Sequence, residues 1–109
     1  MSIYKTQETA RKNLDIEAYA ATLHDDYEFI SHMDGMVMNK EKAMEMFTFL
    51  LNNDDFVTQE SRCLYENDDV LVTHAIMGFP DGTREAVLAF HQLQDGKIIR
   101  METGATLLK

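Results

Sequence analysis

The fold of this chain is decided by residues 70–108, which read VLVTHAIMGF-PDG-TREAVLAFHQL-QDG-KIIRMETGATLL. Runs rich in β-branched and other apolar residues alternate here with two short segments that contain Asp-Gly. Pro80 presets φ in the first turn, and Gly82 accepts the positive φ that a tight turn requires. We therefore predict three antiparallel strands joined as successive hairpins. They cover residues 70–79, 83–93 and 97–108.

The strands of this segment are apolar on both faces. In residues 70–79, Val72 and Ile76 lie on one face, and Leu71 and Met77 lie on the other. An antiparallel strand with one wet face should instead alternate apolar and polar residues. Helices can cover only one face, and a second copy of the chain is the simplest cover for the other. We therefore predict a homodimer through the outer sheet face.

Two short helices open the chain. Apolar residues at helical spacing follow Ser2, a good N-terminal capping residue, and predict a helix over residues 2–13. Asp15 caps a second helix, whose apolar face includes Tyr19 and which the acidic pair at 25–26 ends.

A hairpin, a third helix and one more strand follow. Residues 27–33 favour a strand on which Phe29 and Ser31 point to one face and His32 to the other. The Asp-Gly pair at 34–35 is a strong two-residue hairpin signal. The remaining predicted elements are a return strand over 36–38, a helix from Asn39 to Leu51 with Phe47 on its buried face, and a strand over 57–65. Helices segregated from hairpin-linked strands indicate one α+β domain that spans the whole chain.

Composition limits the partners. The chain has 109 residues and a net charge of −9, from 19 acidic and 10 basic residues. The electric field of this negative charge repels nucleic acid and anionic membranes. No stretch approaches the roughly 18 apolar residues of a spanning helix, and the first residues lack the pattern of a signal peptide, so we expect a cytoplasmic protein. Cys63, the only cysteine, is expected to be an inert buried thiol.

The order of these elements resembles the nuclear transport factor 2-like superfamily, and within it SnoaL-like and ketosteroid-isomerase-like small proteins. The resemblance implies a cone-shaped, curved antiparallel sheet wrapped around three N-terminal helices, a cystatin-like roll. It also implies a pocket at the open end and often a dimer through the outer sheet face. The residues that carry the resemblance are Leu-Asp-Ile-Glu-Ala at 14–18, Leu-His-Asp-Asp at 23–26, Glu-Phe-Ile at 28–30, Glu-Lys-Ala-Met at 41–44 and Gln-Asp-Gly-Lys-Ile at 94–98.

The resemblance leaves the activity open, because members include isomerases, polyketide cyclases, dehydratases, hydrolases and binding proteins. Ketosteroid isomerases place a general-base Asp on the first strand, where this chain has residues 30–32, Ile-Ser-His. Their oxyanion-donating Tyr in the first helix corresponds to Gln7, and their protonated acid falls in residues 89–91, Ala-Phe-His. The cyclases direct an acid from the sheet into the pocket, and none is evident here. These departures argue against steroid isomerisation by the family mechanism.

Histidines are the candidates for acid–base chemistry, because imidazole titrates near neutrality. His32, His74 and His91 lie on three different predicted strands. His91 shares the inner face with Ala89, and His74 joins it if the hairpin around Asp81 has an odd register. We predict His32, His91 and Asp34 as catalytic residues. The alternative is that each imidazole is hydrogen-bonded and structural, and that Asp34 is only a turn residue.

A ligand pocket is predicted on the inner sheet face. Tyr19 offers a phenolic donor there, although a tyrosine on an apolar helix face is more often core. No close-spaced pair such as His-x-His occurs, so we predict no metal site and no cofactor. The ligand-binding residues that we predict are Tyr19, Phe29, Ser31, Phe47, Cys63, His74 and Met101.

Three functions remain open from the sequence. The first is a homodimeric protein that binds a small, largely apolar organic ligand. The second is a cofactor-free isomerase, cyclase or dehydratase, with His91 or His32 as base and Tyr19 or His74 as proton donor. The third is an interaction module whose pocket is filled by side chains, because eight methionines can adapt to a closed core.

Overall fold

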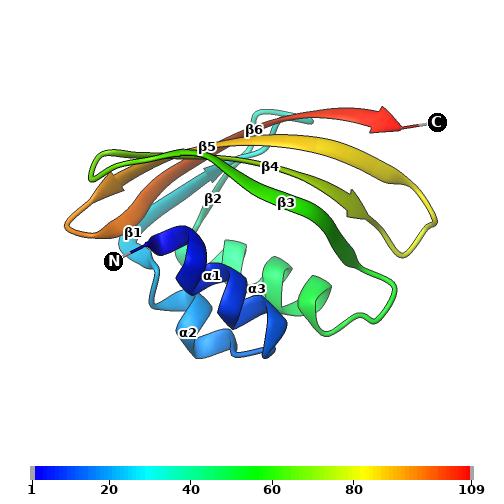
Figure 1. Ribbon diagram of the computed structural model, residues 1–109, viewed down its shortest axis with the longest axis horizontal. Helices are drawn as coiled ribbons and strands as arrows, with labels where there is room; N and C mark the ends of the chain where they lie inside the picture. The colour runs from blue at the N-terminus through cyan, green and yellow to red at the C-terminus, as the bar shows by residue number, and fades with distance from the viewer. Residues whose placement is uncertain (1, 109) are drawn as a thin grey trace.

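The computed structural model describes residues 2–108 and consists of a curved six-stranded sheet with three helices beneath it (Figure 1). The predicted α+β class is confirmed. The elements are α1 (Ile3–Lys12), α2 (Ile16–Ala20), β1 (Leu23–Ile30), β2 (Val37–Asn39), α3 (Lys40–Leu51), β3 (Val57–Glu66), β4 (Val70–Gly78), β5 (Arg84–Gln94) and β6 (Lys97–Leu108).

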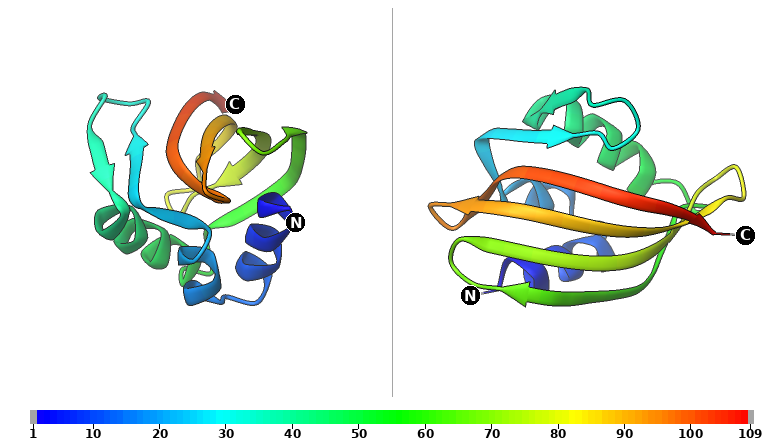
Figure 2. Two further views of the ribbon diagram at one scale, coloured as in Figure 1. Left: turned by 90° about the vertical axis from the view of Figure 1, so that its left-hand side faces the viewer. Right: turned by 90° about the horizontal axis from the view of Figure 1, so that it is seen from above.

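The sheet has the strand order β2-β1-β6-β5-β4-β3. Strands β3 to β6 are successive antiparallel neighbours, and the turns at 80–82 and 94–96 join β4 to β5 and β5 to β6 as predicted. Strand β1 lies parallel to β6, so the sheet is antiparallel in four of its five described pairings. The sheet curves around the helices without closing (Figure 2). Its concave inner face therefore faces α1, α2 and α3.

The helices begin where the sequence predicts. The side chains of Ser2, Asp15 and Asn39 each accept the backbone N–H of the residue three positions on. Each cap satisfies one of the donors that a helix N-terminus leaves free.

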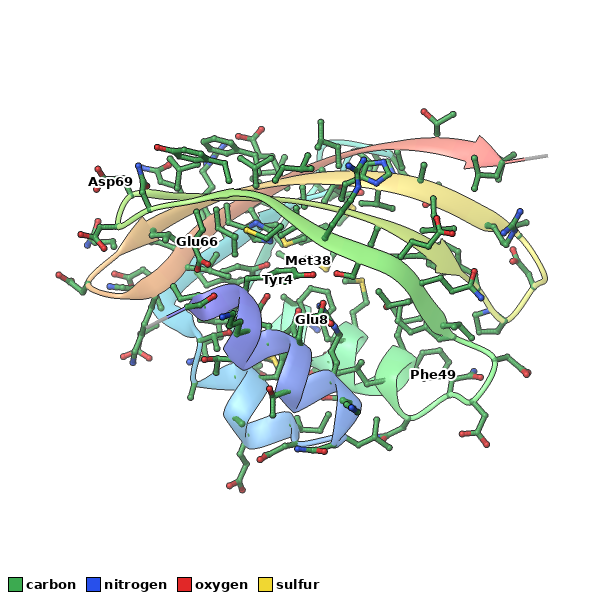
Figure 3. The ribbon with its side chains drawn as sticks, in the orientation of Figure 1. Tyr4, Glu8, Met38, Phe49, Glu66 and Asp69 are labelled. Atoms are coloured by element: carbon green, nitrogen blue, oxygen red, sulfur yellow. The ribbon has the colours of Figure 1, made fainter. Side chains whose placement is uncertain are left out.

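A residue from the sheet also caps α1. The Glu66 carboxylate accepts the N–H groups of Ile3 and Tyr4 at 2.9 and 3.3 Å and the Ser2 hydroxyl at 2.7 Å. Negative charge at a helix N-terminus also complements the helix dipole. Glu66 therefore fixes α1 to the end of β3, beneath the sheet (Figure 3).

The predicted second helix is too long. It ends at Ala20, and β1 begins at Leu23, four residues before the strand that the sequence predicted. The Ile98 N–H donates to the Thr22 carbonyl at 2.9 Å, and Leu23 lies opposite Ile98 in the parallel pairing. Leu23 and Tyr27 are only 1% exposed. Pairing with β6 and burial therefore override the helical pattern of this segment.

The Asp-Gly pairs at 34–35 and 95–96 behave differently. Asp95 and Gly96 both have positive φ, 55° and 75°, and form the tight turn that this dipeptide favours. The pair at 34–35 does not form the predicted two-residue hairpin, because only Gly35 has positive φ, 72°. The Asp34 carboxylate instead accepts a backbone N–H two residues on, at 3.0 Å. Residues 31–36 consequently form a longer loop between β1 and β2.

The main core lies between the inner sheet face and the helices. Its buried members come from both layers: Leu23, Tyr27, Phe29, Ala43, Leu71, Leu93 and Ile98. On the outer face, Leu88 and Phe90 of β5 are 49% and 45% exposed. No helix among residues 2–108 combines the length and the hydropathy that crossing a bilayer requires.

Candidate functional site: a cavity beneath the sheet

A cavity of about 610 Å³ lies between the helices and the inner face of the sheet. Its size falls within the roughly 300–1,000 Å³ of small-molecule sites. The wall extends to Pro80 and Asp81, exposed residues of the β4–β5 turn, which reaches beyond the helices in Figure 1. Most of the wall is apolar, and it includes Met38, Met46, Phe47, Leu50, Phe56 and Val87.

Small residues on β4 and β5 contribute to this space. Ala75 and Ala89 are buried, point to the inner face and line the cavity. In the ladder, Ala75 lies opposite Val87, and Ala89 lies opposite Thr73. Short side chains on neighbouring strands leave a hollow that leucine or phenylalanine would occupy.

The structure brings most of the predicted site residues to this cavity. The wall contains seven of them: Tyr19, Phe29, Ser31, His32, Phe47, His91 and Met101. Asp34, Cys63 and His74 are not part of the wall. Asp34 is exposed in the loop at 31–36, where its side chain has the turn role described above.

His74 and Cys63 depart from the positions expected for them. His74 lies opposite Leu88 on the outer face, so it does not share a cavity with His91, which lies opposite Leu71. Cys63 is exposed, so the expectation of a buried thiol is wrong. Strand β3 changes register on both sides of this segment and has a positive φ of 50° at Glu60. Irregularity of this kind redirects side chains, which simple alternation does not predict.

His91 is a buried imidazole with one nitrogen bonded. It is 4% exposed, and its Nδ1 lies 3.0 Å from the Leu71 carbonyl oxygen. A carbonyl only accepts, so Nδ1 carries the proton and the neutral ring has its lone pair on Nε2. Burial lowers the pKa of His91; the bond to Leu71 opposes this effect, and the charge of Arg11 adds to it. His91 therefore supplies a neutral acceptor at neutral pH.

A chain of hydrogen bonds links α1 to β3 beside the cavity. The Ser61 hydroxyl donates to Glu8 Oε1 at 2.7 Å, so the Tyr4 hydroxyl, 3.0 Å away, donates to Ser61. Arg11 Nη2 forms an ion pair with the same Glu8 oxygen. Figure 3 shows Tyr4 and Glu8 beneath the sheet. We call Tyr4, Glu8, Arg11 and Ser61 the Arg11 cluster.

The carboxylate of this cluster is ionised. Partial burial raises the pKa of Glu8, but the hydrogen bond from Ser61 and the charge of Arg11 outweigh burial and lower the pKa overall. The residues predicted from the sequence do not include this cluster, although the sequence contains a signal for it. Tyr4, Glu8 and Arg11 have the i, i+4, i+7 spacing that places side chains on one helix face.

Tyr19 adds a hydroxyl donor near Arg11. Burial raises the pKa of this tyrosine, and the nearby Arg11 guanidinium partly opposes the rise. The phenol therefore stays protonated at neutral pH. Its ring packs edge-on against Phe47 at a centroid distance of 5.6 Å, and Phe47 packs against Phe29 at 6.1 Å. Tyr19 thus joins an aromatic wall to a polar group.

The loop and the strand ends place further polar groups on the wall. His32 is exposed, and its Nδ1 lies 2.5 Å from Thr103 Oγ1. It reaches the cavity because β1 ends at Ile30, so strand alternation does not extend to it. Glu85 lines the cavity from the inner face of β5, which corrects the expectation that no acid points inward. His91 lies six steps along the strand from Glu85, which is about 20 Å.

No group of three His, Cys, Asp or Glu side chains within residues 2–108 is arranged to hold a metal ion. Comparisons of the sequence with known proteins find no match. No model of a known protein family matches the chain, and no curated protein matches it.

Solved structures do match. An NTF2-like protein of unknown function from Mesorhizobium loti superimposes with a TM-score of 0.77 at 13% identity, over 95% of this chain and 88% of that one. IdmH, a candidate polyketide cyclase from Streptomyces antibioticus, gives 0.74 at 15% identity, over 94% and 88%. A steroid delta-isomerase from Pseudomonas aeruginosa gives 0.73 at 14%, over 95% and 77%. At these identities the matches concern the fold, and they confirm the nuclear transport factor 2-like architecture that the sequence resembled.

Proposed function

We propose that this chain, with its nuclear transport factor 2-like fold, binds a small and largely apolar organic molecule in the cavity beneath its sheet. The observation that supports this proposal most directly is the cavity of about 610 Å³, which has a mainly apolar wall and a few polar groups. Such a site is the usual form of a small-molecule pocket. A space of this size also argues against the interaction module with a core filled by side chains.

Two alanines on the same strand provide the test. Ala89 lies on the inner face and lines the cavity, whereas Ala86 lies on the outer face of β5 and does not. The neutral fluorescent probe N-phenyl-1-naphthylamine should bind wild type. Ala89→Leu should weaken binding at least about tenfold by occupying the space, and Ala86→Leu should leave binding unchanged. Equal effects of the two substitutions, or no probe binding by wild type, would count against the proposal.

A cofactor-free acid–base enzyme in the same cavity is the second candidate. The observation that favours it is the hydrogen bond between His91 Nδ1 and the Leu71 carbonyl oxygen, which leaves Nε2 of the neutral ring as the basic atom. Tyr19 and Arg11 offer donors to an oxygen that gains negative charge. These groups fit isomerisation, cyclisation or dehydration of a carbonyl compound, without the acids of the ketosteroid isomerases.

The enzyme candidate is tested in D₂O. Wild type would accelerate α-proton exchange in a panel of apolar ketones, followed by NMR, and His91→Asn would abolish that acceleration. His32→Asn is the matched control, because it removes the other imidazole of the cavity wall, which lies in a loop. NMR titration of the imidazoles in wild type and both variants reports whether His91 and His32 influence each other. Exchange that His91→Asn leaves intact would remove His91 as the base.

We also propose a homodimer through the outer sheet face. Leu88 and Phe90 are exposed there to nearly half of their area, and burial of such residues stabilises association. Phe90→Lys should therefore lower the dimer fraction in analytical ultracentrifugation. Phe49→Lys, on a 68%-exposed phenylalanine of α3, is the control. A monomeric wild type at about 100 μM would refute this part of the proposal. The cytoplasmic location and the lack of a nucleic-acid partner remain predictions from the sequence.

A further inference from the structure

Arg11 has unused donors at the cavity wall. A guanidinium carries five N–H groups. Among the described residues, Arg11 Nη2 donates to Glu8, and the Tyr19 hydroxyl lies near enough to accept a second hydrogen bond from the guanidinium, which leaves further N–H groups free. No fully buried side-chain nitrogen or oxygen within residues 2–108 lacks a partner, so the remaining nitrogens of Arg11 border accessible space. Arg11 is also one of the residues that line the cavity.

The surroundings of Arg11 favour an oxygen ligand. The Tyr19 hydroxyl lies close enough for the two groups to influence each other electrostatically, and it supplies another donor. The acids of the wall, Asp81 and Glu85, belong to the β4–β5 turn and to the adjacent end of β5. A negatively charged group on a ligand is repelled by that end and attracted to Arg11.

We propose that Arg11 binds a carboxylate group of the ligand, so that the pocket takes apolar organic monocarboxylates. This inference rests on the proposed ligand-binding function and names the class of ligand. The planar guanidinium matches the geometry of a carboxylate and can donate two parallel hydrogen bonds to it. The apolar body of the ligand then lies along the Phe29, Phe47 and Met38 side of the cavity.

Glu8 has two opposite effects in this arrangement. Its ion pair with Nη2 orients the guanidinium, and its bond from Ser61 holds the carboxylate in place. Glu8 also neutralises part of the positive charge that a ligand would use. Removing the charge of Glu8 while keeping its shape should therefore strengthen carboxylate binding.

Naphthalene-1-acetate and naphthalene-1-acetamide test the inference, because the two probes differ only in the charged group. Isothermal titration calorimetry at pH 7 and low salt measures both dissociation constants. Hydrogen bonds to charged groups are typically strong enough for wild type to bind the acetate about tenfold or more tightly than the amide.

Three substitutions make the test specific. Arg11→Gln should reduce the acetate-to-amide ratio to about one while the amide still binds, and Glu8→Gln should increase the ratio above that of wild type. Arg62→Gln, on an exposed outer-face arginine of β3, should leave the ratio unchanged. If Arg11→Gln does not fold, the Glu8→Gln result decides, and an unchanged or reduced ratio overturns the inference.

The outcomes also separate the two proposals. If wild type binds the amide or the neutral fluorescent probe without preferring the acetate, Arg11 does not select a carboxylate, and the apolar pocket stands. If wild type binds none of the three probes, both the carboxylate site and the pocket function fail.

Discussion

The side chains on the two faces of the sheet differ in burial, although both faces are apolar. On the inner face of β5, Val87, Ala89 and His91 are buried, whereas Leu88 and Phe90 on the outer face are about half exposed. The inner face curves over the helices and leaves a cavity where its residues are small. The outer face lies open to solvent in a single chain. Apolar character alone therefore does not tell whether the chain covers a face with its own helices, and on the covered face the size of the residues and the curvature of the sheet decide whether room remains for a ligand.

The largest expected difference between the faces concerns a leucine on each. Leu71 is 0% exposed on the inner face, and Leu88 is 49% exposed on the outer face. Leu71→Ala should lower the free energy of unfolding by about 2–5 kcal/mol, because it leaves a core cavity. Leu88→Ala should cost less than about 1 kcal/mol in the monomer. Urea denaturation followed by circular dichroism measures both values.

The leucine comparison also reports on assembly. If Leu88→Ala costs as much as Leu71→Ala, and the cost rises with protein concentration, the outer face is buried between two chains, as proposed. A Leu71→Ala cost below about 1 kcal/mol would contradict the core described here.

A glutamate on each face gives the next largest effect. Glu66→Ala removes the carboxylate that caps α1 from β3 and should cost about 1–2 kcal/mol. Glu102→Ala removes an exposed outer-face partner of Arg100 and should cost no more than about 0.5 kcal/mol. Thermal and urea unfolding of both variants test the difference. Equal costs would show that Glu66 does not anchor α1.

The smallest expected difference in stability concerns a histidine on each face, and this difference depends on pH. Burial lowers the pKa of His91 from its ordinary value of 6.5. At a pH below 6.5, this imidazole therefore binds a proton more readily in the unfolded chain than in the folded one. The stability from neutral His91 is therefore complete above that pH. It decreases as the pH falls toward the folded pKa, by at most about 1.4 kcal/mol per pH unit.

His91→Asn isolates this contribution, since the amide can keep the hydrogen bond to the Leu71 carbonyl. Urea denaturation between pH 7.5 and 5 should show a smaller loss of stability in this variant than in wild type. His74→Asn removes an imidazole from the outer face and is the control, in which the loss due to His91 should persist. Identical slopes in wild type and His91→Asn would disprove the role assigned to burial of this residue.

Much of the fold could be predicted because local chemistry decides it. The β6 bounds at 97–108 agree with the prediction, since Asp95-Gly96 forces a tight turn and apolar residues follow it. The three capping residues begin the helices as expected, because their side chains satisfy N–H groups of the same turn. Interactions within a few residues are visible in a sequence.

The errors arose where distant segments meet. Leu23 belongs to a strand because β6 pairs with it, and the loop at 31–36 is longer than its Asp-Gly pair suggests. The face of His74 stayed open in the sequence, because only the β4–β5 pairing determines the register. Cys63 was misplaced because irregularities in β3 alter its alternation. Each outcome depends on hydrogen bonds between residues far apart in the chain or on a bulge with no sequence signature here.

By itself, the sequence determined the α+β class, the hairpin meander and the helix starts. Only the tertiary structure decided that His91 has a bonded Nδ1, that His74 lies on the opposite face, and that Arg11 meets Glu8 and Ser61. The physical reason is that periodicity assigns a residue to a face of its own element. Strand register, sheet curvature and helix docking then decide which faces meet, and those depend on the whole chain.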